Sequence, residues 1–506
     1  MAFDMTSLQD YILEQFPTPS NSKYLHSIEA IEKGDIKVVI DIIQNGVDIN
    51  EFFTTGKFYN PLLVAIEENK VEIIKYLIAN PNVVSSTGKT PLRAAISSGC
   101  PQTVEILVKN CADIDYFYEN HMNALFHAIY KRNEEIIQTL IDNGSDPNAE
   151  NGAGSTPLLS AIEFGNTRVI EILLKSGADT QLKRPIHFAI RQENTEAVKT
   201  LLENGANPNI KGPNEVINSL SLAISKRSME VVTLLVEHGV DVNACDGWWI
   251  KYTPIHVAIK NGHFKIVKYL LANGADLNID INSGCRFTPL IEAVYCGDQQ
   301  IVEILIKNGA NIDQIYDGWT AVAEAIYCND PPMVKFLVNN GANIEQSYGN
   351  EDNPLLHAIK IQNVQIIQIL IAHGANLNID YVHGWTALLA AVDRNNYDCA
   401  KILLENGAKT SKSPSGILPL SMAIDMGNLE MVNLLLEFGA DLNASDINHK
   451  APIHAALKLG HTKIVNFLIA QDACQRKRSY NGCNSLELTL VDKKNSLMKM
   501  LLFYVN

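Results

Sequence analysis

The sequence lacks the features that mark several large classes of protein. Among its 506 residues, no run approaches the roughly 18 uninterrupted apolar residues that a transmembrane helix needs. The opening segment, MAFDMTSLQDYILEQF, carries charges where a signal peptide would be apolar. These absences predict a soluble protein that is made and kept in the cytosol, without a membrane partner.

Cysteine is scarce, and basic charge is outweighed by acidic charge. The nine cysteines are odd in number, scattered and without a CxxC pair, which predicts free, mostly packed thiols in a reducing compartment. A formal net charge of -15 opposes binding to DNA, RNA or anionic lipid, because phosphates attract surfaces rich in lysine and arginine. The densest basic cluster, CQRKRSY at 474–480, is short and indicates a solvated loop.

Motifs for metal, phosphate or nucleophilic chemistry are also missing. No HExxH, paired CxxC or closely spaced histidine cluster occurs. The nearest approach to a phosphate-binding loop, NGAGST at 151–156, lacks the GK[ST] ending and a preceding strand. The sequence therefore predicts no catalytic residue, no metal ligand and no cofactor.

What the chain does contain is one unit repeated about fifteen times. The segments TPLLSAIEFGNTRVIEILLKSGAD (156–179), TPIHVAIKNGHFKIVKYLLANGAD (253–276) and TPLIEAVYCGDQQIVEILIKNGAN (288–311) align without gaps. We number each unit from the threonine of TPL as unit position 1, which gives spacings of 28 to 35 residues. The units begin at residues 25, 60, 90, 123, 156, 184, 218, 253, 288, 320, 353, 386, 418, 451 and 484.

Three columns of the repeat have a physical meaning. Unit position 6 is alanine in fourteen of the fifteen units, with Thr489 the exception, and a small residue lets the neighbouring unit approach closely. Unit position 18 is leucine in fourteen units, with Ile42 the exception, and belongs to a helix with one apolar face. Unit position 22 is glycine in eleven of the first fourteen units, which predicts a left-handed residue that ends this second helix.

The helices of one unit cannot bury their apolar faces alone, so the units must stack. Pro157, Pro254 and Pro289 each follow a threonine that can cap a helix, so they fall in the first turn of the unit's first helix. Pro331 and Pro332 likewise open a second helix. Cys296 and Cys328 share unit position 9, so the register of the repeat explains their equivalent places.

This pattern resembles the ankyrin repeat, whose TPLH start, helical pair and closing GAD-N are matched by TPIHVAIKNGHFKIVKYLLANGADLN at 253–278. The resemblance covers about residues 25 to 504. It implies an all-α, ankyrin-repeat solenoid: antiparallel helix pairs, each followed by a projecting hairpin or finger, stacked into a curved superhelix. It also implies that His187, His256 and His454, at unit position 4, form a hydrogen bond that steadies the hairpin.

Departures from the regular unit set the expected organisation. We predict an N-terminal capping helix over 1–24, about fourteen tandem repeats over 25–483 and a C-terminal capping repeat over 484–506. Pro81 and Cys111 replace the closing glycine in two units. The unit that begins at 156 is only 28 residues long, so its finger must be truncated.

The fingers carry aromatic residues that the helical core does not need. At the residue just before unit position 1, which we call the finger position, four of the five units from the eighth to the twelfth are aromatic. A stripe of partly exposed rings is typical of surfaces that anchor a partner, although each ring could instead pack on the neighbouring finger. The predicted partner-binding residues are Trp248, Trp249, Tyr252, Phe287, Trp319 and Trp385, with the acidic Asp246, Asp317, Glu351 and Asp352 beside them.

A second aromatic group, FFTTGKFY at 52–59 and YFY at 116–118, could serve the N-terminal fingers or pack as part of the cap.

These residues favour a non-enzymatic scaffold that binds another protein, one with a basic or apolar patch, through the concave finger and first-helix surface. The resemblance adds one further expectation, a secreted effector that acts on proteins in a host cytosol. The alternative is an enzyme or modifier of host proteins whose active site is embedded among the repeats. Chemical change of a bound partner, measured by mass spectrometry, would distinguish the two. The oligomeric state is left open by the sequence.

Overall fold

The computed structural model describes most of the chain. The described residues are 19–46, 53–54, 58–85, 88–118, 122–210, 217–246, 252–278, 287–316, 318–347, 353–379, 384–444 and 451–479. The chain divides into two compact units, Met1–Ala244 and Cys245–Asn506. We call them the first and second halves and describe each by itself.

Each half is a row of antiparallel helix pairs, and fourteen pairs are described in all. The first helices of the pairs are α2 (Pro19–Lys33), α4 (Pro61–Glu67), α6 (Pro91–Ser98), α8 (Ala124–Lys131), α10 (Pro157–Glu163), α12 (Pro185–Arg191) and α14 (Ser219–Ser225) in the first half, and α16 (Pro254–Lys260), α18 (Pro289–Tyr295), α20 (Ala321–Tyr327), α22 (Pro354–Lys360), α24 (Ala387–Asp393), α26 (Pro419–Asp425) and α28 (Pro452–Lys458) in the second.

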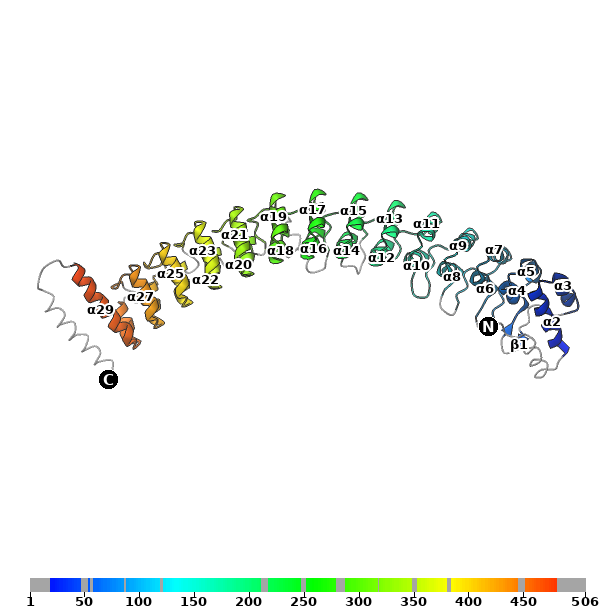
Figure 1. Ribbon diagram of the computed structural model, residues 1–506, viewed down its shortest axis with the longest axis horizontal. Coiled ribbons are helices and arrows are strands. Elements are labelled where there is room, and N and C mark those ends of the chain that lie inside the picture. Colours follow the sequence, from blue (N-terminus) through cyan, green and yellow to red (C-terminus); the bar gives the residue numbers. More distant parts are fainter. Residues whose placement is uncertain are drawn as a thin grey trace. The chain divides into compact units, whose positions relative to one another are not determined.

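The second helices are α3 (Ile36–Gln44), α5 (Val71–Leu77), α7 (Pro101–Lys109), α9 (Glu134–Asp142), α11 (Thr167–Lys175), α13 (Thr195–Glu203) and α15 (Met229–Glu237) in the first half, and α17 (Phe264–Ala272), α19 (Gln299–Lys307), α21 (Pro331–Asn339), α23 (Val364–Ala372), α25 (Tyr397–Glu405), α27 (Leu429–Glu437) and α29 (Thr462–Ser479) in the second. Within each half, first helices line up on one side of the row and second helices on the other (Figure 1). The expectation of an all-α solenoid is confirmed.

Local sequence explains where the first helices begin. The side chain of Thr156 accepts a hydrogen bond from the backbone N–H of Leu159, and Pro157 occupies the first helical position. Thr288 and Pro289 do the same for α18. A proline at this position loses no helical hydrogen bond, and a threonine cap satisfies an otherwise unpaired N–H. The predicted helix starts, including Pro331 at the start of α21, are therefore confirmed.

The core is built from the two columns that the sequence indicated. All fourteen alanines at unit position 6, from Ala30 to Ala456, are buried. The leucines at unit position 18 are buried from Leu77 to Leu468, whereas Leu501 and Thr489 lie outside the described residues. Within each half, every first helix packs against the first helices of its neighbours in that half, as α20 does against α18 and α22. The small alanine is what permits this close packing of helix on helix.

The turns between helices have a left-handed backbone at two unit positions. All eleven closing glycines at unit position 22 have φ between 79° and 99°, which confirms the predicted C-terminal signal of the second helix. Cys111, which replaces a closing glycine, adopts the same conformation with φ of 65°. A second left-handed column, which the sequence did not reveal to us, lies at unit position 10 in all fourteen described pairs. Half of its members are not glycine: Asn69, Arg132, Glu193, Arg227, Asn329, Gln362 and Asn395.

The fingers contain little regular strand. Among the described residues, β1 (Phe53–Thr54) and β2 (Phe58–Tyr59) form one antiparallel hairpin, with Phe53 opposite Tyr59. The finger of the unit that begins at 156 is truncated as predicted. Two consecutive left-handed residues, Lys183 and Arg184, turn the chain directly into α12.

In four of the described units, an asparagine at unit position 26 fastens the finger to the next unit. The side-chain N–H of Asn278 donates to the Gly309 carbonyl at 3.1 Å, and its Oδ1 accepts from the backbone N–H of Asn311 at 2.8 Å. Asn148, Asn209 and Asn378 make the same pair of bonds. We call this arrangement the asparagine clasp. It explains the asparagine of the GAD-N pattern, because its amide carries a donor N–H and an acceptor oxygen on separate atoms and so can bond two backbone groups at once.

The clasp gives a testable contribution to stability. Asn278→Ala removes two inter-repeat hydrogen bonds, and we expect the free energy of unfolding to fall by about 1–2 kcal/mol. Urea denaturation followed by circular dichroism measures the change. Asn273→Ala is the matched control, because the Asn273 amide bonds only to the Tyr269 carbonyl of its own helix. Equal effects of the two substitutions would show that the clasp adds nothing between repeats.

The ends of the chain leave the predicted domain boundaries partly untested. The boundary between residues 24 and 25 falls inside α2, which runs continuously from Pro19 to Lys33. Residues 1–18, in the predicted N-terminal cap, and 480–506, which include the predicted C-terminal capping repeat, lie outside the described residues.

Candidate functional site

The structure places four of the six predicted aromatic site residues. Tyr252, Phe287, Trp319 and Trp385 are all partly exposed, on successive or nearby fingers of the second half. Of the other predicted site residues, Trp248, Trp249, Asp317, Glu351 and Asp352 lie outside the described residues.

Asp246 does not lie where the sequence predicted an exposed acid. Asp246 is only 9% exposed, and its backbone pairs with that of Tyr252 through hydrogen bonds of 2.8 and 2.9 Å. This residue closes the base of a finger, so it offers no carboxylate on the finger surface.

Each of three finger rings lies against unit position 8 of its own unit, at the C-terminal end of the first helix. Phe287 stacks on Tyr295, with ring centroids 6.1 Å apart and planes inclined by 30°. Trp319 meets Tyr327 edge-on at 5.5 Å. The third ring, that of Tyr252, has the ammonium group of Lys260 over its face at 5.2 Å.

Tyr295 and Tyr327 were missed by sequence reasoning, yet they are the more exposed members of these pairs. Tyr327 is 63% exposed and Tyr295 is 57% exposed. They lie on α18 and α20, which pack side by side (Figure 1). We call Phe287, Tyr295, Trp319 and Tyr327 the aromatic patch. Reading unit position 8 as a column, as was done for the finger position, would have found both tyrosines.

Trp319 also reaches the following unit, where its ring lies 6.0 Å from that of His357. Trp385, by contrast, lies on the finger two units farther along. Its neighbour Gly384 accepts a hydrogen bond from Ser415 Oγ at 3.2 Å, which ties this finger to the next. Among the described residues, no ring contact joins Trp385 to the aromatic patch.

The helices that carry the patch tyrosines, α18 and α20, each also carry a glutamate. Glu292 and Glu324 occupy unit position 5, three residues before Tyr295 and Tyr327, so each Glu–Tyr pair shares one helix face. Both glutamates are buried, at 3% and 4% exposure. They therefore belong to the packed interior beside the patch and not to its exposed surface.

Nearby carboxylates affect the two cysteine thiols beside the patch. Cys296 and Cys328 follow the two tyrosines and are exposed, and of the six cysteines whose side chains the structure describes only Cys399 is buried. The prediction that the thiols are mostly packed is therefore wrong for the described cysteines. Burial of the thiol and the nearby Glu324 carboxylate raise the pKa of Cys328 to about 11. The Cys328 thiol is 3.7 Å from Glu324 Oε1, to which it can donate.

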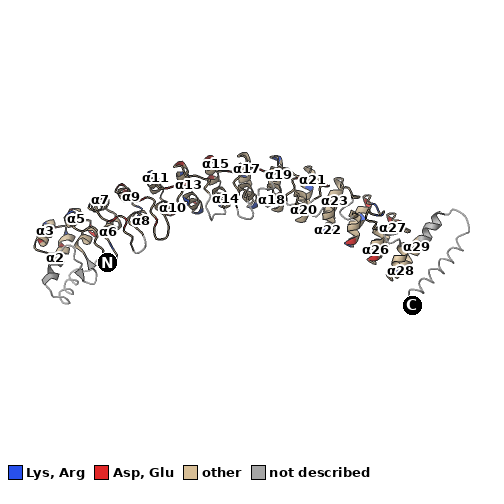
Figure 2. Ribbon diagram, turned by 180° about the vertical axis from the view of Figure 1, so that it is seen from behind, with Lys and Arg blue, Asp and Glu red and all other residues tan. Residues whose placement is uncertain are grey.

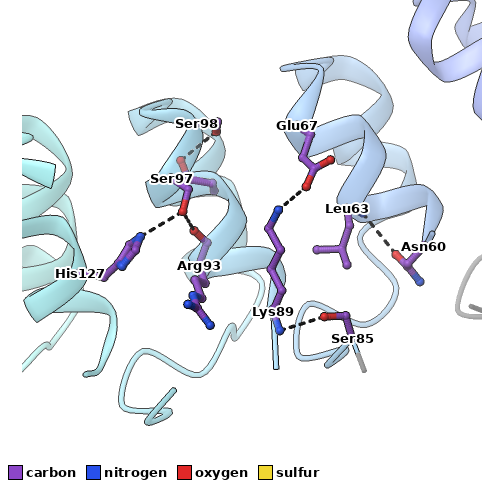
Figure 3. Close-up of polar contacts among 10 residues, drawn as sticks. Asn60, Leu63, Glu67, Ser85, Lys89, Arg93, Ser97, Ser98 and His127 are labelled. Atoms are coloured by element: carbon purple, nitrogen blue, oxygen red, sulfur yellow. Dashed lines mark hydrogen bonds and ion pairs between the residues drawn. The ribbon is translucent and has the colours of Figure 1, made fainter. Parts of the chain in front are cut away.

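At one place in the first half, unit position 8 and the next finger position carry a charged pair in place of rings. Glu67 at unit position 8 forms an ion pair with Lys89 at the next finger position, as Figure 3 shows. The backbone N–H of Lys89 is held by Ser85 Oγ at 2.9 Å. The Glu67 carboxylate and the Lys89 ammonium group thus compensate each other's charge within the chain. The two faces therefore share a backbone arrangement but differ in chemistry.

Ser97 and His127 lie close together in the first half, but their hydrogen bonds are not those of a catalytic serine–histidine pair. Ser97 Oγ lies 3.0 Å from His127 Nε2 (Figure 3). The Ser97 hydroxyl donates to the Arg93 carbonyl at 2.8 Å, so it accepts from the histidine ring rather than surrendering a proton to it. Burial and the neighbouring Arg93 lower the pKa of His127 to about 4. This geometry is not that of a serine activated by a base.

The N-terminal aromatic group divides into buried and exposed members. Tyr118 is buried, the Arg93 guanidinium lies 5.0 Å above its ring, and burial raises the pKa of its phenol to about 12. Tyr116 and Phe117 are exposed. Tyr118 therefore follows the packing interpretation of this group, whereas no side chain of 52–59 is among the described ones.

The histidines at unit position 4 differ from one another. His256 Nδ1 accepts from the Thr253 hydroxyl at 2.8 Å, and its Nε2–H donates to the Phe287 carbonyl at 2.9 Å. It therefore joins one helix start to the next finger, as the resemblance implied, and it supports the backbone of the aromatic patch. His187 is buried, whereas His454 is exposed.

Other site types have no counterpart in the part of the chain that the structure describes. No group of three or more histidine, cysteine or acidic residues there could hold a metal ion. No helix there is long and apolar enough to cross a membrane. Basic and acidic segments are interspersed along the helices of each half, as Figure 2 shows.

Comparison with known proteins agrees with this architecture. The family model for ankyrin repeats matches residues 27–120, 125–212, 186–281, 277–348, 345–414 and 409–479. The human transient receptor potential cation channel subfamily A member 1 is 28% identical over 187 residues, which are 36% of this chain and 15% of the channel. An ankyrin repeat protein of fowlpox virus (strain NVSL) is 33% identical over 122 residues, 23% of this chain and 28% of the viral protein.

Among solved structures, the ankyrin repeat domain of Bcl-3 is similar to this chain at 26% sequence identity with a TM-score of 0.40, covering 44% of this chain and all of that one. The chain spans less than a third of either curated relative. Ankyrin repeats are general protein–protein interaction modules. The matches to the family model run from residue 27 to residue 479, and on that ground this chain belongs to the ankyrin-repeat family.

Proposed function

We propose that the chain is a non-enzymatic scaffold that binds a partner protein through the aromatic patch. The observation that carries the proposal is the exposure of Tyr295 and Tyr327, at 57% and 63%, beside the partly exposed rings of Phe287 and Trp319. Adjacent exposed rings on a rigid support are the usual anchors of protein interfaces.

The stacked helices do not need these rings for cohesion. The core around the patch is buried without them, with Ala293, Ala325, Leu305 and Leu337 of the alanine and leucine columns at 0% exposure. Unit position 8 does not require a ring, because Glu67 occupies it in the first half and forms an ion pair with Lys89 of the next finger. The exposed tyrosines thus have surface left for a partner.

We place this binding activity in the cytosol, or in a host cytosol if the chain acts as a secreted effector. The net charge of -15 and the free thiols among the described cysteines support a reducing compartment and a partner other than nucleic acid.

A capture experiment tests the proposal. The full-length chain is used as bait in cytosolic extract, beside a Tyr295→Ser/Tyr327→Ser variant and a Tyr130→Ser control. Tyr130 occupies unit position 8 in the first half and is 54% exposed, so it matches the tyrosines of the patch. We expect one protein to be retained by the wild type and by the control but at least tenfold less by the patch variant, because truncated hot-spot rings cost 2 kcal/mol or more.

Tyrosine substitution is cleaner than Trp319→Ala, because the Trp319 ring also contacts His357 of the next unit and its loss would disturb packing. Equal retention by all three baits would contradict the proposal. The intact mass of the captured partner, measured before and after incubation, tests the enzymatic alternative. A mass change that requires the chain would favour that alternative.

A further inference from the structure

We propose that the aromatic patch binds an extended, proline-containing segment of the partner, with an acidic residue of that segment beside Lys260. The segment takes the polyproline II conformation and places two prolines, three residues apart, against Tyr295 and Tyr327. This inference rests on the proposed function and names the kind of segment that the patch binds.

The two exposed tyrosines are spaced like residues on one side of a polyproline II helix. Tyr295 and Tyr327 both occupy unit position 8, on α18 and α20, which pack against each other. Packed helices lie about 8–10 Å apart. A polyproline II helix has three residues per turn and rises about 3.1 Å per residue, so every third residue points the same way at intervals of about 9 Å. A β-strand fits less well, because residues on one of its faces are about 7 or about 13 Å apart.

The patch offers rings and hydroxyl groups rather than charges. Tyr295 and Tyr327 are 57% and 63% exposed. The glutamates of the same helices, Glu292 and Glu324, are buried and present no carboxylate to a partner. Aromatic surfaces bind proline-rich segments, which are already extended and therefore lose little entropy on binding. The backbone of such a segment has no internal hydrogen bonds, so its carbonyls can accept from the phenolic O–H groups of the tyrosines.

A cation lies at one end of the tyrosine pair. Lys260 occupies unit position 8 on α16, which packs against α18, and it is exposed. Burial raises the pKa of the Cys296 thiol, and Lys260 acts in the opposite direction, so its charge reaches the patch. Lys307 and Lys401 of the same half pair with glutamates of their own helices, whereas Lys260 lies over the Tyr252 ring and forms no ion pair with a described residue. A carboxylate of the partner complements this lysine.

The three side chains at unit position 8, Lys260, Tyr295 and Tyr327, lie on three successive first helices. At three residues per helix, they match the sequence acidic-x-x-Pro-x-x-Pro. The net charge of -15 disfavours an acidic segment at long range. A preference for an acidic over a basic segment would therefore come from the local site.

The test uses the peptide Ac-Glu-Pro-Ala-Pro-Ala-Ala-Pro-Ala with a C-terminal fluorophore, titrated with the full-length protein and followed by fluorescence anisotropy. In a second peptide lysine replaces the glutamate, and in a third alanine replaces every proline. We expect the first peptide to bind at least threefold more tightly than the lysine peptide and at least tenfold more tightly than the alanine peptide.

Variants of the protein locate the contact. Tyr295→Ser/Tyr327→Ser should weaken binding of the first peptide at least tenfold, and Tyr295→Phe/Tyr327→Phe, which keeps the rings but not the hydroxyl groups, about threefold. Tyr130→Ser should leave binding unchanged. Lys260→Gln should abolish the preference for the glutamate peptide over the lysine peptide, whereas Lys335→Gln, an exposed lysine on α21, should not. Thermal unfolding verifies that each variant is folded.

Equal binding of the three peptides would overturn the inference, as would a preference for glutamate that survives Lys260→Gln. Equal weakening by the patch variant and by Tyr130→Ser would also overturn it, since the peptide would then bind without using the patch. If a captured protein depends on the patch but the glutamate peptide does not bind, the proposed function stands and this inference alone is wrong.

Discussion

Ala325→Leu is expected to lower the free energy of unfolding of the second half by about 2–3 kcal/mol. Ala325 is fully buried in α20, which packs against α18 on one side and α22 on the other. A leucine adds three carbon atoms where no space exists, so neighbouring helices must move apart or strain their side chains. Because every repeat touches only its neighbours, the stack has no distant contacts with which to compensate.

Chemical denaturation of the full-length variant measures this effect, with Ala372→Leu as the control. Ala372 ends α23 in the same half and is exposed, so its substitution should change the free energy of unfolding by less than about 0.5 kcal/mol. A cost for Ala325→Leu no larger than that of the control would mean that the alanine column does not set the spacing of the repeats.

His256→Ala is expected to lower the free energy of unfolding by about 2–3 kcal/mol at pH 7. It should also reduce the loss of stability that the protein shows as the pH falls. His256 is buried, and its ring links Thr253 to the Phe287 carbonyl. Removing the ring leaves a cavity and two buried polar groups without their partner.

The pH dependence follows from the lowered pKa of His256. Burial lowers this pKa from 6.5 to about 4, although the hydrogen bond to the Phe287 carbonyl acts in the opposite direction. Above pH 6.5 the imidazole is neutral in both states, and its contribution is fully present. As pH falls toward about 4, the unfolded chain binds a proton that the folded chain does not, so stability decreases by up to about 3 kcal/mol.

The free energy of unfolding should therefore be measured from pH 7.5 to 4 for wild type, His256→Ala and His454→Ala. The gap between wild type and His256→Ala should narrow toward pH 4. His454 occupies the same unit position but is exposed, so its substitution should cost less than about 0.5 kcal/mol. A gap that is constant across the range would show that His256 does not stay neutral in the folded protein.

Much of the fold could be predicted because the same residue types recur at the same unit positions along the repeats. The alanine, leucine and closing-glycine columns are simple statements about packing and backbone, and the structure confirms them in the described units. The left-handed residues at unit position 10 escaped notice because only half of them are glycine, and the asparagine, arginine, glutamate and glutamine residues of the other units do not by themselves indicate a left-handed backbone. Side-chain identity reports such a turn only weakly.

The candidate site was less predictable, because it depends on how each finger folds against its own helix. Finger rings such as Trp319 stood out from their composition, but their pairing with Tyr295 and Tyr327 required knowing that a finger folds back onto the end of its own first helix. Asp246 shows the reverse error, since an acid in a joint was predicted to be exposed and is instead buried at the finger base. Charge in a loop does not fix the direction of its side chain.

The most direct test of the central claim compares binding with stability in one variant. For Tyr295→Ala/Tyr327→Ala, the dissociation constant for the captured partner and the free energy of unfolding are measured on the same preparation. We expect affinity to fall at least tenfold, about 1.4 kcal/mol, while stability changes by less than about 1 kcal/mol, because both rings are mostly exposed. Unchanged affinity, or a loss of stability as large as the loss of binding energy, would contradict the assignment of these rings to a partner.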